Sequence, residues 1–249
     1  MKIRFTKILL LMLFMCTVMT EIMAGTLLLW KKQQDTEEQR LYQNLEKMVT
    51  KKKVRDLKAG QLDQLPDLDE SALRKQNSEY VAWLFVPDTV ISYPVVYPEN
   101  NRKYLTVGFD QTGHSYGCLF FDASAEPFST MNTVIHGHNM RSGDMFGSLK
   151  NYLEQDYADQ HTELYLLIDG IWNRYELLSA YKMNQLDVFP YQNVFSNKLD
   201  LRCYMNQIKA ESMVDTQAEI PTNIGELLTL STCHGEKEKM IVQWVKKQE

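Results

Sequence analysis

One cysteine, Cys233, stands at the end of an apolar run in the segment TLSTCHGEKEKMIV (229–242). In this segment TLSTC has the Leu and Thr content of a short strand, HGEKEK is a charged turn, and MIV begins a second apolar run. A lone cysteine is more often a small buried core residue than a reactive group. The position of Cys233 favours a nucleophile, because solvent exposure and nearby positive charge both stabilise the reactive thiolate.

A cysteine nucleophile needs an imidazole for proton transfer, and the sequence has five histidines. Two of them, His136 and His138, lie in VIHGHNM at the end of another apolar run. His138 follows Gly137, which permits close approach of the backbone, whereas His136 continues the strand pattern and is accounted for by packing. A zinc ion held by the two histidines and Cys233 is an alternative, but the sequence offers no further ligand cluster, so we expect no metal.

The third requirement is a cation or donor for the oxyanion that forms when a thiolate attacks a carbonyl group. Lys237 and Lys239 both follow Cys233, and an ordinary solvated turn explains Lys237. Lys239 directly precedes the second apolar run, so an antiparallel return of the chain would bring it beside the cysteine. The sequence therefore predicts cysteine, histidine and lysine side chains at neighbouring strand ends.

A mostly β domain must position these residues. From about residue 80 the sequence consists of short apolar runs cut by Pro, Gly, Asn and Asp. Eight such runs predict a closed or nearly closed barrel, and two helical patterns interrupt them. The predicted strands are 81–86, 90–97, 117–121, 132–137, 162–168, 174–183, 227–233 and 240–245, and the predicted helices lie near 143–157 and 197–210.

Composition restricts the class of function. A chain of 249 residues with 44% hydrophobic residues can bury one sizeable core. A formal charge of −5 and a pI near 5.6 argue against nucleic acid as the main partner. The four cysteines contain no CxxC pair, which predicts neither a disulfide framework nor a zinc ribbon and is compatible with a free thiol.

The N-terminus predicts attachment to a membrane. Residues 1–7 carry three basic side chains and are expected on the cytoplasmic side. The apolar run at 8–30 is long enough to cross a hydrocarbon core of roughly 30 Å once. Its apolar residues continue beyond Ala24 and Gly25, which favours an uncleaved signal anchor over a cleaved signal peptide.

The rest of the chain is expected outside the membrane in two parts. Residues 31–76 are predicted to form a helical linker with N-terminal helices, and residues 77–249 the catalytic domain. Thr36 and Gln39 have the spacing of a capping box, which predicts that a separate amphipathic helix begins there and ends near Gly60.

The chain resembles the sortases, and most closely the class B sortases, in WLFVPDTVISYPVVYPENNRKYL, GCLFFDASAEP, VIHGHNMRSGDMFGSLKNY and LTLSTC. Sortases of this class are membrane-anchored cysteine transpeptidases of Gram-positive bacteria. The resemblance covers roughly residues 77–245. It implies a closed β-barrel of seven to eight strands with N-terminal helices, a helical insertion before the strand that carries the cysteine, and no cofactor.

The resemblance also implies a reaction and its partners. The thiolate would attack a Thr–Gly or Thr–Asn type of peptide bond in a C-terminal sorting signal and form a thioester acyl-enzyme. The amine that resolves it would come from a peptidoglycan cross-bridge or from a pilin lysine. The expected partners are thus a surface protein or pilin, that amine, and the membrane through the N-terminal helix, but no nucleic acid.

Single residues follow from the same motifs. Cys233 matches the nucleophile and His138 the catalytic histidine. Ser231 and Thr232 precede the cysteine in TLSTC and are candidate substrate-binding residues, as is Asn101 in the ENNRKYL segment.

The sequence departs from the family where an arginine is expected. Lys239 takes the place of the arginine that begins the strand after the cysteine, and Arg141 is the nearest arginine to His138 by sequence. Lysine keeps the charge but lacks the planar fork that makes two parallel hydrogen bonds. The protein is therefore expected to be a transpeptidase that uses Lys239 or recruits an arginine such as Arg141. The alternative is a catalytically weakened sortase-like protein that binds sorting signals or assists pilus assembly without efficient turnover.

Overall fold

A computed structural model describes residues 2–49, 65, 67–221, 226–235 and 237–247. The chain divides into two compact units, Met1–Leu41 and Tyr42–Glu249. The first unit is helical. The second contains all of the described strands and carries the candidate site.

Helix α1 (Lys2–Val49) runs without a break through the predicted membrane span. By length and composition it is suited to crossing a membrane, with a mean hydropathy of 1.8 in its most apolar window. The prediction of a separate helix beginning at Thr36 is wrong. The Thr36 hydroxyl instead donates to the carbonyl of Lys32 at 2.8 Å, a bond typical of a helix interior. The predicted helix end near Gly60 lies outside the described residues.

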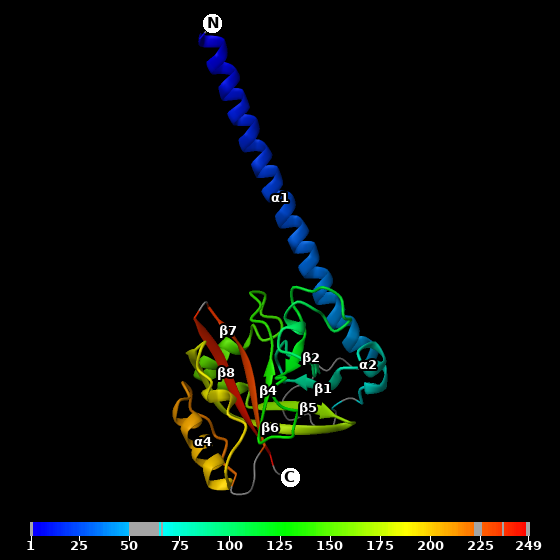
Figure 1. Cartoon of the computed structure of the whole chain (residues 1–249), viewed down its shortest axis with the longest axis vertical. Coiled ribbons are helices and arrows are strands. Elements are labelled where there is room, and N and C mark those ends of the chain that lie inside the picture. Colours follow the sequence, from blue (N-terminus) through cyan, green and yellow to red (C-terminus); the bar gives the residue numbers. More distant parts are fainter. Residues whose placement is uncertain (1, 50–64, 66, 222–225, 236, 248–249) are drawn as a thin grey trace. The chain divides into compact units, whose positions relative to one another are not determined.

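The second unit is built on a closed barrel of eight strands in the order β1-β2-β3-β4-β7-β8-β6-β5 (Figure 1). The pairs β2–β3 and β4–β7 are parallel and the others are antiparallel. Every strand lies within a few residues of its predicted position, which confirms the predicted mostly β barrel. The strands are β1 (Tyr80–Phe85), β2 (Ser92–Val96), β3 (Leu119–Phe121), β4 (Asn132–His136), β5 (Glu163–Ile168), β6 (Ile171–Asn184), β7 (Leu227–His234) and β8 (Glu238–Lys246).

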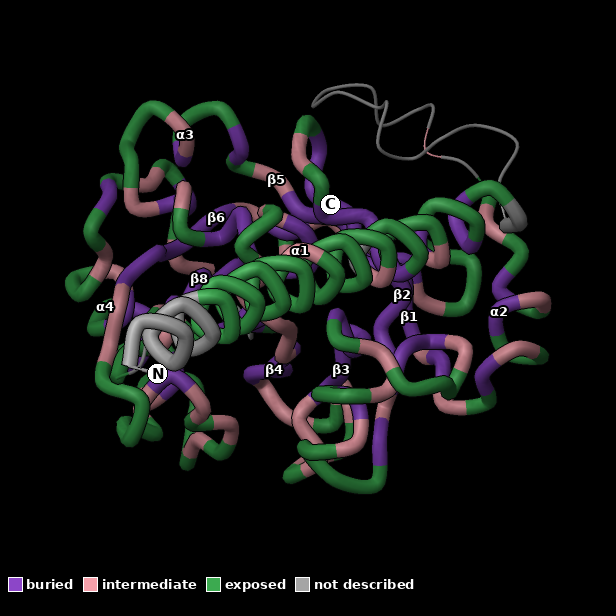
Figure 2. The backbone as a smooth tube through the Cα atoms, turned by 90° about the horizontal axis from the view of Figure 1, so that it is seen from above, coloured by how far each residue is buried: buried purple, intermediate pink, exposed green. Residues whose placement is uncertain are grey.

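Large apolar side chains fill the barrel, with Trp83 and Trp244 among the largest that are fully buried. Figure 2 shows the strands mostly as buried backbone, whereas the connecting loops are largely exposed. The strand sequences are apolar on successive residues rather than alternating, since both faces of several strands are covered. The core therefore holds the strand ends that carry the candidate residues.

The shorter helices cover the barrel and its rims. The pattern predicted as one helix at 143–157 is in fact two short elements, η4 and α3, because the chain turns at Glu154. The short elements are α2 (Glu70–Gln76), η3 (Lys103–Leu105), η4 (Leu149–Leu153), α3 (Gln155–Gln160) and η5 (Phe189–Tyr191).

Helix α4 (Lys198–Ala210) forms the insertion between β6 and β7, close to its predicted bounds. Asn197 caps its first turn by accepting a hydrogen bond from the backbone amide of Asp200 at 3.0 Å. The apolar stripe of α4 is buried against β6, β7 and β8 at the usual helical spacing, by Leu201, Tyr204, Met205 and Ile208. This packing holds η5, which precedes α4, beside the strand that carries Cys233.

Candidate active site

Cys233 is a free, exposed cysteine near the end of β7. The register of β7 with β8 places Lys239 directly opposite it. Directly opposed residues in an antiparallel pair have Cβ atoms about 4.5–5.5 Å apart and share one face of the sheet. The antiparallel return expected from the sequence therefore brings the thiol and the ammonium group onto the same face, as neighbours.

The segment that carries His138 lies next to Cys233 because β4 and β7 are parallel. His136 pairs with Ser231, and the amide of Gly137 donates to the carbonyl of Ser231 at 3.3 Å. Beyond the strand, the side-chain amide of Asn139 donates to the carbonyl of Cys233 at 2.6 Å. This bond joins the residue after His138 to the backbone of the cysteine.

The His138 ring is held by the backbone of η3. Its Nε2 lies 2.6 Å from the carbonyl oxygen of Leu105. A carbonyl oxygen only accepts, so Nε2 carries the hydrogen of this bond and Nδ1 is the nitrogen left to exchange a proton. Gly117, with φ +59°, lies against the ring: a Cβ there would be 3.3 Å from His138 Cδ2 and 2.2 Å from the carbonyl oxygen of Tyr104. Glycine is thus required beside the histidine.

The Lys239 ammonium lies over the ring of Tyr191, with Nζ 4.7 Å from the ring centroid. The Tyr191 hydroxyl is 2.7 Å from the Ser231 hydroxyl, which is itself buried. No carboxylate among the described residues pairs with Lys239, and Glu236 of the intervening turn lies outside them. The cation therefore has an aromatic partner and remains available to a developing negative charge.

The imidazole of His136 contacts a carboxylate. Its Nε2 is 2.8 Å from Oδ2 of Asp122, and the same oxygen accepts from the Asn101 amide at 3.0 Å. Partial burial alone would raise the pKa of Asp122, but hydrogen bonds from His136 and Ser124 outweigh it and hold that pKa below its usual value. No three metal-ligating side chains gather among the described residues.

The three candidate substrate-binding residues have different positions. Ser231 shares the face of Cys233 but is covered by Tyr191. Asn101 is exposed and also accepts from the backbone amide of Ala123 at 2.7 Å, so it orders the loop that carries Asp122. Thr232 lies between Ser231 and Cys233, points to the opposite face of β7 and is 4% exposed, so its side chain is turned away from Cys233.

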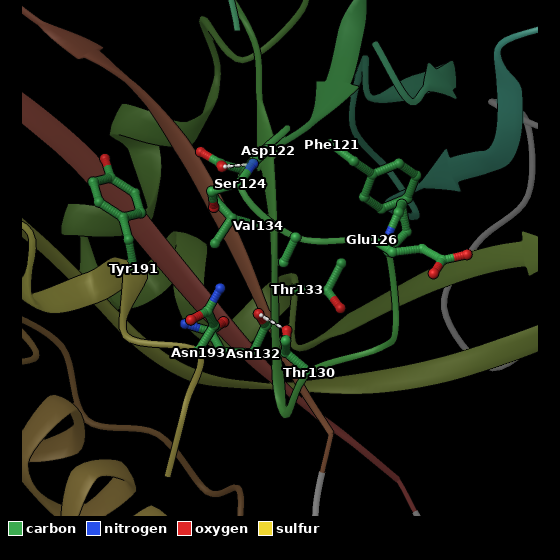
Figure 3. Close-up of a pocket in the computed structure, with 12 residues that line it drawn as sticks. Phe121, Asp122, Ser124, Glu126, Thr130, Asn132, Thr133, Val134, Tyr191 and Asn193 are labelled. Carbon is green, nitrogen blue, oxygen red and sulfur yellow. Dashed lines mark hydrogen bonds between the residues drawn. The ribbon is translucent and has the colours of Figure 1, made fainter. Parts of the chain in front are cut away.

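A small pocket, partly open to solvent, lies beside Tyr191 between β4 and the loop after β3. Figure 3 shows Tyr191 on one side of the pocket and Phe121 and Glu126 on the other. The register of β4 with β7 pairs Val134 of the pocket with Thr229, four residues before Cys233, or about 13 Å along the strand. The pocket is lined by Phe121, Asp122, Ser124, Ala125, Glu126, Pro127, Thr130, Asn132, Thr133, Val134, Tyr191 and Asn193.

Sequence reasoning missed three residues of this site: Asn139, Asp122 and Tyr191. Asn139 stands next to His138 within the quoted motif, so adjacency was an available signal. Asp122 and Tyr191 reach the site through long-range contacts with His136 and Lys239, which no local pattern reveals.

A family model described as the Sortase domain matches residues 84–246 of the chain. Sortase B of Listeria monocytogenes is 29% identical over 177 residues, which cover 69% of this chain and 71% of that protein. Sortase B of Staphylococcus aureus is 28% identical over the same shares. A solved structure of a mutant form of Clostridium perfringens sortase B has a TM-score of 0.72 and 25% identity, covering 84% of this chain and 98% of that one.

Proposed function

Since the chain belongs to the sortase family and its relatives are class B sortases, we propose that it cleaves a C-terminal sorting signal through a thioester acyl-enzyme. It then transfers the cleaved protein to an amine. The observation that carries this proposal is the exposed thiol of Cys233 with Lys239 directly across the strand pair and the His138 segment bonded to its backbone.

The first half of the reaction makes the acyl-enzyme. The Cys233 thiolate attacks the carbonyl carbon of the scissile bond, and the oxygen takes up the negative charge. The Lys239 ammonium stabilises this oxyanion in place of the family's arginine. Protonated His138 gives a proton to the leaving amine as the C–N bond breaks, which leaves a thioester on Cys233 and a neutral imidazole.

The second half runs through the same groups in reverse. An amine from a peptidoglycan cross-bridge or a pilin lysine attacks the thioester carbonyl, and neutral His138 accepts the proton that the amine loses. The tetrahedral intermediate collapses by breaking the C–S bond, which restores the thiolate. Water in place of the amine gives hydrolysis instead of transfer.

The N-terminal helix supports a location at the membrane. The apolar part of α1 would anchor the chain as a single-pass span, with the barrel on the extracellular side. This placement puts the thiol where surface proteins and cell-wall amines occur.

The test is turnover of a sorting-signal peptide library with an added amine, using the full-length protein in detergent. Replacing Cys233 with alanine should abolish both cleavage and transfer. Cys203→Ala is the matched control, since Cys203 is a free and exposed cysteine on α4, and it should retain activity. Persistent turnover in Cys233→Ala would remove the assignment of the nucleophile.

The second candidate function is binding of sorting signals without efficient turnover, which the lysine at position 239 favours. A thiol-reactive probe separates the two, because Cys203 and Cys233 are both exposed and accessibility alone would label them equally. A working site labels Cys233 faster than Cys203. Cys118 should give the slowest labelling rate of the three, since burial raises the pKa of its thiol.

A further inference from the structure

We propose that Tyr191 is a positioning residue that holds the Lys239 ammonium beside Cys233. The inference rests on the proposed function, because it concerns the cation of that reaction. Its geometric basis is the contact of Lys239 Nζ with the face of the Tyr191 ring at 4.7 Å. A cation within about 6 Å of a ring centroid is attracted by the ring quadrupole.

The ring is fixed relative to the strand that carries the nucleophile. The Tyr191 hydroxyl bonds to Ser231 at 2.7 Å, and Ser231 lies two residues before Cys233 on the same face of β7. Tyr191 therefore contacts both strands of the pair, β7 through its hydroxyl and the Lys239 side chain of β8 through its ring. A displacement of the ring would move the cation relative to the thiol.

The backbone of η5 is held on both sides of Tyr191. The side-chain amide of Asn132 donates to the carbonyls of Pro190 at 2.9 Å and Gln192 at 3.0 Å. Asn132 is 2% exposed, and its own carbonyl oxygen accepts from the Thr229 hydroxyl at 2.8 Å. Because the amide of one buried side chain bonds both neighbours of Tyr191, the position of the ring is set by β4 and β7.

A second set of bonds fixes η5 from the side of α4. The Tyr204 hydroxyl donates to the carbonyl of Phe189 at 3.1 Å and accepts from the Gln243 amide at 3.3 Å. Gln243 lies on β8, four residues after Lys239, and is fully buried. The insertion is thus tied to the strand that carries the cation as well as to the strand that carries the thiol.

A lysine needs this contact more than an arginine would. Its ammonium is a point charge on a flexible four-carbon stem, whereas a guanidinium fork is already planar and directional. The aromatic face of Tyr191 limits the positions that the flexible lysine side chain can give its ammonium group, and it does not neutralise the charge. Since no carboxylate among the described residues competes for Lys239, the contact leaves the charge free for the oxyanion.

The experiment compares Tyr191→Leu with Tyr191→Phe in the full-length protein. Tyr191→Leu removes the aromatic face and should lower kcat about three- to tenfold, with a smaller change in KM. Tyr191→Phe keeps the ring, loses only the bond to Ser231, and should restore most of kcat. If Tyr191 only formed part of the substrate-binding surface, Tyr191→Leu would raise KM and leave kcat unchanged, and this result would overturn the proposal.

A double-mutant cycle tests whether Tyr191 acts through Lys239. In a Lys239→Ala background, Tyr191→Leu should cause no further loss of kcat, because the group that it positions is gone. If the full loss persists in that background, Tyr191 acts by another route and the proposal fails.

An NMR measurement tests the contact without any turnover. Reductive ¹³C-methylation of the lysines keeps their charge, and Lys239→Arg identifies the Lys239 signal by its disappearance. That signal should be shifted upfield by the ring current, keep the shift in Tyr191→Phe and lose it in Tyr191→Leu. An unchanged signal in Tyr191→Leu would refute the positioning contact. A Tyr191-dependent signal together with unchanged kcat in Lys239→Ala would support the contact and refute the oxyanion role.

Discussion

Replacing Asn139 with alanine removes the hydrogen bond from its side-chain amide to the carbonyl of Cys233. A neutral hydrogen bond of this kind contributes about 0.5–1.5 kcal/mol net. If the bond keeps Cys233 and His138 in their reactive arrangement, its loss raises the barrier by that amount. The expected fall in kcat is then about two- to tenfold, since about 1.4 kcal/mol corresponds to tenfold in rate.

The matched control for Asn139→Ala is Asn206→Ala. Asn206 also donates from its side-chain amide to a backbone carbonyl, that of Arg202 at 2.8 Å, and the bond is likewise exposed. It lies on α4, so its loss should affect stability slightly and kcat not at all. Initial rates of peptide cleavage with saturating amine measure both. An unchanged kcat in Asn139→Ala, or an equal loss in Asn206→Ala, would show that the bond from Asn139 to Cys233 does not support catalysis.

Three further substitutions test the roles of Asp122, Gly137 and Lys239. Asp122→Asn should lower the free energy of unfolding at neutral pH, because it removes the carboxylate bonded to His136. Since the pKa of Asp122 is lowered in the fold, the difference in unfolding free energy between wild type and variant should be full above about pH 4 and shrink as the pH falls below it. Urea unfolding at several pH values measures this difference. Gly137→Ala should destabilise the fold by about 1–3 kcal/mol, because a Cβ there would lie 2.8 Å from Cδ2 of Phe146; an unchanged thermal midpoint would contradict this close packing. Lys239→Ala should lower kcat by about 10²–10³-fold and Lys239→Arg should not, and equal rates in all three proteins would remove the oxyanion role.

The fold was largely predictable because the sequence itself marks the strand boundaries. Proline, glycine and asparagine separate the apolar runs, so all eight strands and α4 lie near their predicted positions. The continuity of α1 through Thr36 was not predictable, since a threonine hydroxyl can bond to a carbonyl within a helix as readily as it caps a helix. The split between η4 and α3 lies at Glu154, where the backbone is extended, and no local sequence pattern marked it.

The candidate site was predictable in its residue types and only partly in its contacts. Cys233 and Lys239 become partners through a short antiparallel return, which is a local feature. The His138 segment joins them through the parallel pairing of β4 and β7, a long-range contact that the residue pattern did not predict. Tyr191 is contributed by an insertion more than 40 residues from either partner strand end. Its role depends on tertiary packing.

Mass spectrometry of the intact protein after incubation with a sorting-signal peptide shows whether Cys233 carries the acyl group. Without an amine, the full-length protein should gain the mass of the peptide's N-terminal fragment less that of one water, held as a thioester on Cys233. Cys203→Ala should form the same adduct and Cys233→Ala should form none. An adduct that survives in Cys233→Ala, or that maps to another residue of the wild type, would contradict the assignment of Cys233 as the nucleophile.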